Sequence, residues 1–168
     1  PAIASRAVLT DRARQWGFEQ VGRHDRAVAP VAAQLGVGWH TIMRQVTERG
    51  KPLIDDPKRL DGVSAIGVDE TAFLRACSTH PTLYATGIAD LTPGRPARLL
   101  DVAAGRSGTV LSGWLAARDD DFRTQIVTAS LDPFRGYATA LAAQLPQTVR
   151  VLDAFHVVKL ALTCVDEV

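Results

Sequence analysis

Three aspartates each follow an apolar stretch of the sequence, and their placement suggests a metal site. Asp69 ends "AIGVD", Asp132 ends "IVTASLD" and Asp153 ends "VRVLD". A lone ionised carboxylate is expensive to bury unless a cation or hydrogen-bond donors compensate its charge. Carboxylates that converge without cysteine suit a hard ion, so we expect Asp69 and Asp132 to bind Mg²⁺ or Mn²⁺. Such ions can activate a hydroxyl and stabilise the leaving oxygen of a phosphodiester.

Each of these aspartates also has a structural alternative. An aspartate at a strand end often caps the next helix, and "DPF" at Asp132 fits that pattern with Pro133 in the first helical turn. We favour capping for Asp153 and a functional role for Asp69. The neighbouring Glu70 should point to the opposite face of the strand, because side chains alternate.

His156 and Lys159 follow Asp153 about one helical turn apart. His156 can equally be a core or capping residue, and Lys159 can face solvent or a phosphate. We keep both, with Asp153, as possible motif residues without an assigned role.

The elements that must position the aspartates follow a definite order. Three β-like runs separated by turn-rich pieces predict antiparallel strands, and strands alternating with helices follow them. This order, βββαβαβα, predicts an α/β fold with a ribonuclease-H-like mixed sheet. Its first and fourth strands are parallel neighbours, which would bring Asp69 and Asp132 within reach of one cation. The expected elements are strands near Val63–Glu70, Thr82–Leu91, Ala97–Ala103, Thr124–Leu131 and Thr148–Asp153, and helices near Ser107–Arg118, Pro133–Leu145 and from Phe155 onward.

An earlier stretch, "VAPVAAQLGVGWHTIMRQV", predicts a helix-turn-helix. Apolar residues are spaced for contacts between two helices, and Gly36 lies at the turn. The second helix would present side chains that read bases or contact phosphates. The structural alternative is a plain hairpin of two helices, with Trp39 packed rather than reading bases. The expected DNA-binding residues are His40, Thr41, Arg44, Gln45 and Arg49.

Charge and composition agree with two parts of different character. Residues 1–62 carry ten Lys and Arg against seven Asp and Glu, whereas residues 63–168 carry nine against eleven. The mildly basic first part favours nucleic acid as a partner. No apolar run could span a membrane, and the two cysteines form no metal-binding motif, so we expect a cytoplasmic protein.

The expected domain organisation has three parts. Residues 1–50 form a helical DNA-binding segment with the helix-turn-helix at about 28–48. Residues 51–62, rich in proline and charge, form a linker. Residues 63–168 form the ribonuclease-H-like domain, which we expect to be truncated at its C-terminal end because the sequence stops within a predicted helix.

Three motifs, "IGVDETAF", "SLDPFRGYATAL" and "VRVLDAFHVVKLA", resemble those of bacterial insertion-sequence transposases of the DDE class. The similar branch has an Asp-x-Phe-His-Val-Val-Lys/Arg signature and a helix-turn-helix before the catalytic domain. The resemblance implies metal-dependent cleavage and strand transfer of transposon-end DNA, with Asp69 and Asp132 as catalytic metal ligands. It also implies double-stranded DNA as a partner and a homo-oligomer at full length.

Two parts of the family pattern have no counterpart in this sequence. These are the third acid, a glutamate on a later helix, and a cysteine-rich zinc-binding segment. We therefore expect a fragment that is inactive by itself. Two alternatives stay open: a helix-turn-helix regulator whose α/β domain is not catalytic, and an inert remnant that folds poorly because one face of its sheet is bare.

Overall fold

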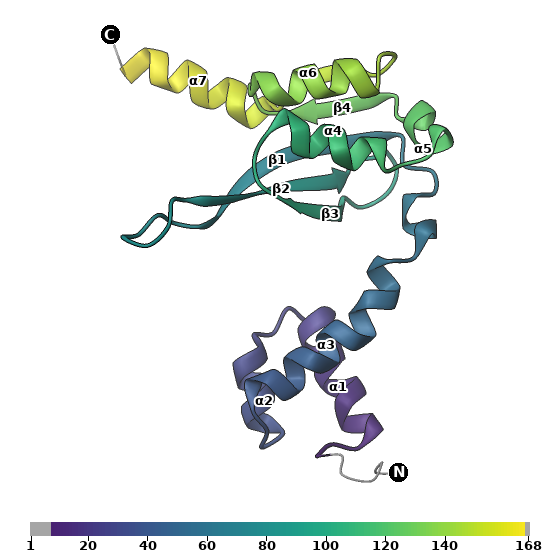
Figure 1. Ribbon diagram of the computed structural model, residues 1–168, viewed down its shortest axis with the longest axis vertical. Helices are drawn as coiled ribbons and strands as arrows, with labels where there is room; N and C mark the ends of the chain where they lie inside the picture. Colours follow the sequence, from purple (N-terminus) through teal and green to yellow (C-terminus); the bar gives the residue numbers. More distant parts are fainter. Residues whose placement is uncertain (1–7, 167–168) are drawn as a thin grey trace. The chain divides into compact units, whose positions relative to one another are not determined.

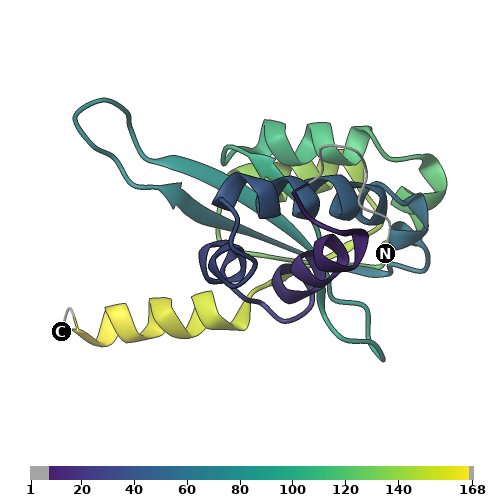
Figure 2. The same cartoon turned by 90° about the horizontal axis from the view of Figure 1, so that it is seen from below.

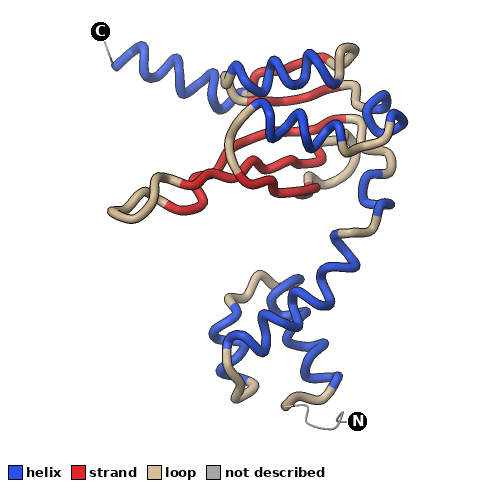
Figure 3. The backbone as a smooth tube through the Cα atoms, in the orientation of Figure 1, coloured by secondary structure: helices blue, strands red, loops and turns tan. Residues whose placement is uncertain are grey.

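The computed structural model describes residues 8–166, and the chain divides into two compact units between Arg59 and Leu60. Residues 1–7 and 167–168, the ends of the two expected domains, lie outside the described part. The first unit is helical and the second contains a sheet with helices (Figures 1 and 3). The helices are α1 (Asp11–Gly22), α2 (Val28–Gln34), α3 (Trp39–Ile54), α4 (Gly108–Ala116), α5 (Asp120–Gln125), α6 (Arg135–Gln144) and α7 (Ala154–Asp166), with a 3-10 turn at Pro57–Leu60, and the strands are β1 (Ala65–Leu74), β2 (Leu83–Asp90), β3 (Arg98–Ala104), β4 (Thr128–Leu131) and β5 (Val149–Leu152).

Helices α1, α2 and α3 form a three-helix unit around a small apolar core. Val31 and Ile42 are fully buried at its centre. Gly17 of α1 faces them, and a Cβ at this position would lie 3.3 Å from Ile42 Cδ1. The turn between α2 and α3 contains Gly36 at φ +64°, a backbone conformation that glycine adopts without strain. This arrangement confirms the helix-turn-helix and adds α1, which the sequence interpretation did not separate.

Helix α3 extends into the segment expected to be a linker. It continues through Pro52 to Ile54, and Lys51 and Asp55 form an ion pair at 2.6 Å across its last turn. Pro52 lacks the backbone N–H that would bond to the preceding turn, but the two residues after it still complete the helix.

The five strands form one mixed sheet in the order β3-β2-β1-β4-β5. The β1–β2 and β2–β3 pairs are antiparallel, whereas β1–β4 and β4–β5 are parallel. The order of strands and helices confirms the ribonuclease-H-like α/β fold. One difference lies before β4, where Asp119 caps the short helix α5 by accepting from Phe122 N at 2.8 Å, so that the strand begins at Thr128 rather than Thr124.

Helices α4 and α6 cover one face of the sheet. Ile66 and Val68 of β1 and Ile88 of β2 join a core with Leu111 of α4 and Leu141 of α6. The opposite face carries apolar side chains that stay exposed by roughly half, among them Leu99, Val102, Val149 and Val151. Within the second unit, no helix covers these side chains among the described residues.

Two segments extend away from this core (Figures 1 and 2). Strands β1 and β2 continue beyond the sheet as a hairpin, with a bulge between Ala72 and Leu74. Helix α7 has no buried residue along its length, and Phe155, Leu162 and other apolar side chains on it are exposed. Within the described part of the chain, no helix has the length and apolarity needed to cross a bilayer.

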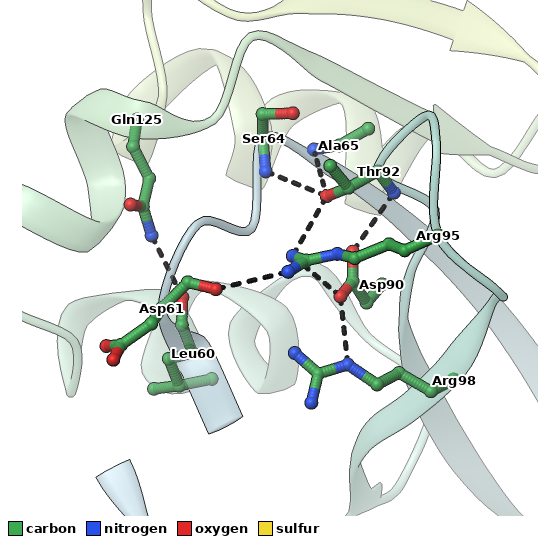
Figure 4. Close-up of polar contacts among 9 residues, drawn as sticks. All are labelled: Leu60, Asp61, Ser64, Ala65, Asp90, Thr92, Arg95, Arg98 and Gln125. Atoms are coloured by element: carbon green, nitrogen blue, oxygen red, sulfur yellow. Dashed lines mark hydrogen bonds and ion pairs between the residues drawn. The ribbon is translucent and has the colours of Figure 1, made fainter. Parts of the chain in front are cut away.

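A polar network fixes the start of β1 against the end of β2 (Figure 4). The Asp90 side chain is fully buried, and its Oδ2 lies 2.8 Å from Arg95 Nη2 and 3.0 Å from Arg98 Nε. Thr92 donates its backbone N–H to Asp90 and accepts from Ser64 N at 2.9 Å. Burial alone would raise the pKa of Asp90, but the hydrogen bonds from Thr92 and Arg98 and the charge of Arg95 lower it overall.

The first turns of α4 and α6 pack so closely that only glycine fits between them. A Cβ on Gly108 would overlap the backbone carbonyl of Gly136. Gly113, one turn further along α4, has nothing within 4 Å of its Cβ position. These two glycines of one helix therefore have opposite steric surroundings.

Substituting alanine at these two positions should change stability in opposite directions. Gly108→Ala should lower the free energy of unfolding by about 1–3 kcal/mol, because the helices must move apart. Gly113→Ala should leave it unchanged or raise it by up to about 1 kcal/mol, through helix propensity. Urea unfolding followed by circular dichroism measures both, and equal effects of the two substitutions would contradict the close crossing.

Removing the charge of Asp90 should destabilise the second unit in a pH-dependent manner. The side chains of Arg95 and Arg98 are 31% and 38% exposed, so solvent screens part of their attraction to Asp90. We therefore expect Asp90→Asn to lower the free energy of unfolding by about 2 kcal/mol at pH 7, less than the loss of one partner from a fully buried ion pair. A lowered folded-state pKa adds stability above the unfolded value of about 3.9, and this contribution is lost as the pH falls through the folded pKa. The difference in the free energy of unfolding between wild type and Asp90→Asn should thus shrink below about pH 4, and urea unfolding at several pH values measures it. Asp61 is an exposed carboxylate nearby. Asp61→Asn should therefore show neither the loss of stability nor its pH dependence.

Candidate metal centre and DNA-binding helix

The sheet register places three aspartates side by side. Val68 of β1 pairs with Leu131 of β4, and Leu131 pairs with Leu152 of β5. Asp69, Asp132 and Asp153 each follow one of these residues, so they lie at adjacent positions along the same edge. Strands β4 and β5 end just before Asp132 and Asp153, whereas β1 continues to Leu74, so Asp69 lies within its strand rather than at the expected strand end. Parallel pairing still makes these residues, distant in sequence, neighbours.

Asp69 and Asp132 approach each other together with His156. One carboxylate oxygen of each aspartate and one ring nitrogen of His156 all lie within 4.8 Å of one another. Asp132 is 8% exposed, whereas Asp69 is open to solvent. The group therefore combines a shielded and an accessible carboxylate, as a site that admits an ion and its water ligands requires.

Local hydrogen bonds orient the two carboxylates. Asp132 Oδ1 accepts from Phe134 N at 3.1 Å, so Asp132 forms the turn that leads into α6. Helix α6 begins at Arg135, which leaves Pro133 before the helix rather than in its first turn. Asp69 Oδ1 accepts from Glu70 N at 2.7 Å. The turn-forming alternative for Asp132 and its position in the cluster are thus compatible.

Asp153 lies outside the cluster and has the capping geometry favoured from sequence. Its Oδ1 accepts from Phe155 N at 3.1 Å at the start of α7, and its Oδ2 lies 3.2 Å from His156 Nδ1. Lys159, one helical turn further along α7, is exposed. Of the three possible motif residues, His156 is the one that joins the aspartates.

Tyr137 of α6 lies near the acidic group, on the face of the sheet that Glu70 also faces, a feature that the sequence interpretation did not identify. Its side chain is fully buried and its hydroxyl lies 2.9 Å from Thr86 Oγ1, which donates to Gly105 O at 2.8 Å. The tyrosine hydroxyl must therefore donate to Thr86. Burial raises the pKa of Tyr137, and the nearby carboxylates of Glu70, Asp132 and Asp69 raise it further, so the phenol remains neutral.

Glu70 points away from Asp69, as strand alternation predicts. Its Oε1 lies 3.0 Å from Arg106 Nη1, while Oε2 is buried without a hydrogen-bond partner. Arg106 also stacks on the Tyr84 ring, with the guanidinium carbon 4.4 Å from the ring centroid. The positive charge of Arg106 thus compensates the negative charge of Glu70, next to the site. No sequence pattern indicated the pair, since its partners lie on β1 and in the loop after β3.

The structure divides the expected DNA-binding residues of α3 into two sets. His40 and Arg44 are exposed and Thr41 is half-buried. Gln45 is only 3% exposed and donates to Glu48 Oε2 at 3.2 Å, so the expectation that it points outward is not met. Arg49 donates to Gln15 Oε1 at 2.9 Å and lies 3.6 Å from Asp11 Oδ1, which ties it to α1.

The division of α3 follows from helical spacing. Ile42, Gln45 and Arg49 recur at three- and four-residue intervals and share the face that packs on α1. Trp39, expected to be packed, is 46% exposed at the start of α3 and meets His40 edge to face. The exposed surface of α3 thus begins with Trp39 and His40 and continues to Arg44.

Comparison with known families agrees with both units. The helix-turn-helix domain of transposase family ISL3 matches residues 1–50, and the transposase model of the same family, for its DDE domain, matches residues 66–168. No curated protein matches the chain. The two matches support a DNA transposase that binds DNA, and the family implies divalent metal use in general. Since the transposase model alone covers more than half of the sequence, the chain belongs to the ISL3 family of insertion-sequence transposases.

Proposed function

We propose that Asp69 and Asp132 hold Mg²⁺ or Mn²⁺ for cleavage and strand transfer of transposon-end DNA. The observation that carries this proposal is the Val68–Leu131 register pair, which makes the two aspartates neighbours on adjacent parallel strands. Their oxygens suit a hard divalent cation, and Asp132 is only 8% exposed. When bound, the ion supplies activation of the attacking oxygen and neutralisation of the phosphate charge.

The chain's own residues have distinct roles in this proposal. Asp69 is exposed, so it lies where the DNA backbone would approach the ion. Asp132 is held in the turn before α6 and would bind the ion from the shielded side. The Tyr137–Thr86 hydrogen bond links α6 to β2 near the two aspartates. A neutral phenol there adds no further negative charge to a group that already contains several carboxylates.

The helix-turn-helix would hold the DNA through the exposed part of α3. Helix α3 begins after Gly38 without a side-chain cap, so its first backbone N–H groups are available to a phosphate. His40, Thr41 and Arg44 follow on the same turns. We exclude Gln45 and Arg49 from the proposed contact set because their side chains are engaged within the unit.

We also propose an oligomeric state and a cellular location for the full-length protein. Transposon ends come in pairs, and we propose that the full-length protein acts on them as a homo-oligomer in the cytoplasm. Family membership favours this over the alternative of a regulator with a non-catalytic α/β domain. We propose that residues 66–168 supply the first two acids of the DDE site and that the helix-turn-helix supplies DNA binding.

Neutralising either aspartate should remove the ion site. We expect Asp69→Asn and Asp132→Asn each to weaken Mn²⁺ binding beyond the roughly 10–100-fold that loss of an outer-shell partner costs, because each removes a direct ligand. Isothermal titration of the full chain with MnCl₂ measures this. In any longer form of the protein that cuts DNA, both variants should reduce cleavage to background while DNA binding is retained.

Asp121→Asn provides the matched control, since Asp121 is an exposed carboxylate on α5 away from the cluster. It should bind Mn²⁺ as the wild type does. Wild-type affinity in either Asp69→Asn or Asp132→Asn would rule out the proposed metal centre.

Arg44→Ala should weaken DNA binding through the loss of one phosphate contact. For a random-sequence duplex, the slope of log K against log salt should become shallower by about 1, because one fewer counterion is released. Arg12→Ala removes the same charge from an exposed position on α1 and should change the slope less. Fluorescence anisotropy across a salt series measures both, and identical slopes for the two variants would argue against α3 as the DNA-contacting helix.

A further inference from the structure

The imidazole of His156 is the member of the cluster to which the proposed function gives no role. It lies in the first turn of α7, directly after β5. Its Nδ1 is 3.2 Å from Asp153 Oδ2. An ionised carboxylate can only accept a hydrogen bond, so this contact keeps the proton on Nδ1 and leaves the lone pair of Nε2 free.

The distances bring His156 within reach of an ion held by the aspartates. Ligand atoms of Asp69, Asp132 and His156 all lie within 4.8 Å of one another. Two ligands about 2.1 Å from one ion can be at most about 4.2 Å apart, so small side-chain rotations suffice to bring all three onto a shared ion. The His156 side chain is 24% exposed, so its ring is largely shielded from solvent, as Asp132 is.

Asp153 supports the ring in the way that outer-shell carboxylates support metal-binding histidines. Such a carboxylate fixes the tautomer and orientation of the imidazole and raises its basicity. Asp153 is itself fixed, because its Oδ1 accepts from Phe155 N and its backbone N–H donates to Leu131 O at 2.9 Å. The β4–β5 ladder thus positions Asp153, and Asp153 positions His156.

We propose that His156 Nε2 is a third protein ligand of the ion bound by Asp69 and Asp132, with Asp153 as the positioning residue. This inference rests on the proposed function, since it concerns the same ion. A nitrogen ligand favours transition-metal ions over Mg²⁺ and Ca²⁺, which prefer oxygen. The site should therefore select Mn²⁺ over Mg²⁺ through His156.

Pulsed electron paramagnetic resonance of Mn²⁺ bound to the full chain tests this assignment directly. The wild-type spectrum should contain the ¹⁴N coupling of a coordinated imidazole. His156→Gln should remove this coupling and weaken Mn²⁺ binding more than Mg²⁺ binding. Asp153→Asn keeps a side-chain oxygen for capping and should retain the coupling while lowering Mn²⁺ affinity at least about tenfold.

His80→Gln provides the matched control, because His80 lies on the hairpin outside the cluster. Its spectrum should equal that of the wild type. Two results would overturn the role of His156: Mn²⁺ binding that depends on Asp69 but shows no ¹⁴N coupling, or a coupling that persists in His156→Gln. Either result would still be consistent with the carboxylate site. A lack of saturable Mn²⁺ binding in the wild type would overturn both.

Discussion

The parallel pairing of β1 with β4 is the constraint on which the candidate site depends. These strands lie at the interior of the sheet, and their register makes Val68 and Leu131 neighbours. The core beneath them, with Leu111, Leu115 and Leu141 fully buried, holds this register because a slip by one residue would turn the apolar side chains outward. Asp69 and Asp132 meet because the apolar residues before them are fixed. The geometry of the site is therefore a consequence of packing.

Much of the sheet could be predicted from sequence because its signals are local. The apolar runs before Asp69, Asp132 and Asp153 and the turn-rich segments between the first three strands gave the correct element order. The start of β4 could not be predicted as well. The segment from Thr124 to Ile126 has the composition of a strand, but Asp119 caps a helix that begins at Asp120 and continues through Thr124 and Gln125. A capping hydrogen bond of this kind outweighs β-propensity over such a short segment.

The candidate site divides in the same way between local and long-range signals. The two aspartates were identifiable because each directly follows an apolar run, where an ionised carboxylate needs compensation. Three other features depend on contacts between side chains of different elements, which local patterns do not indicate. These are the approach of His156 to the aspartates, the Tyr137–Thr86 hydrogen bond and the Glu70–Arg106 ion pair. On α3 the helical period alone separates the inward face from the outward face, but Gln45 was assigned to the wrong one because its polarity suggested exposure. Its side chain is satisfied by Glu48 on the next turn, which makes its burial inexpensive.

The bulge between Ala72 and Leu74 has a mechanical consequence for the metal centre. The bulge itself contains the exposed Phe73, and the hairpin that joins β1 to β2 extends away from the core (Figure 2). A regular two-stranded ladder would transmit twisting of the tip along β1 to Asp69, which lies on the same strand. The irregular register interrupts that ladder three residues past Asp69, and a bulge bends the strand and increases its twist at that point. The pairing of Asp69 with Gly87 is therefore set on the near side of the irregularity, separately from the length of the hairpin tip.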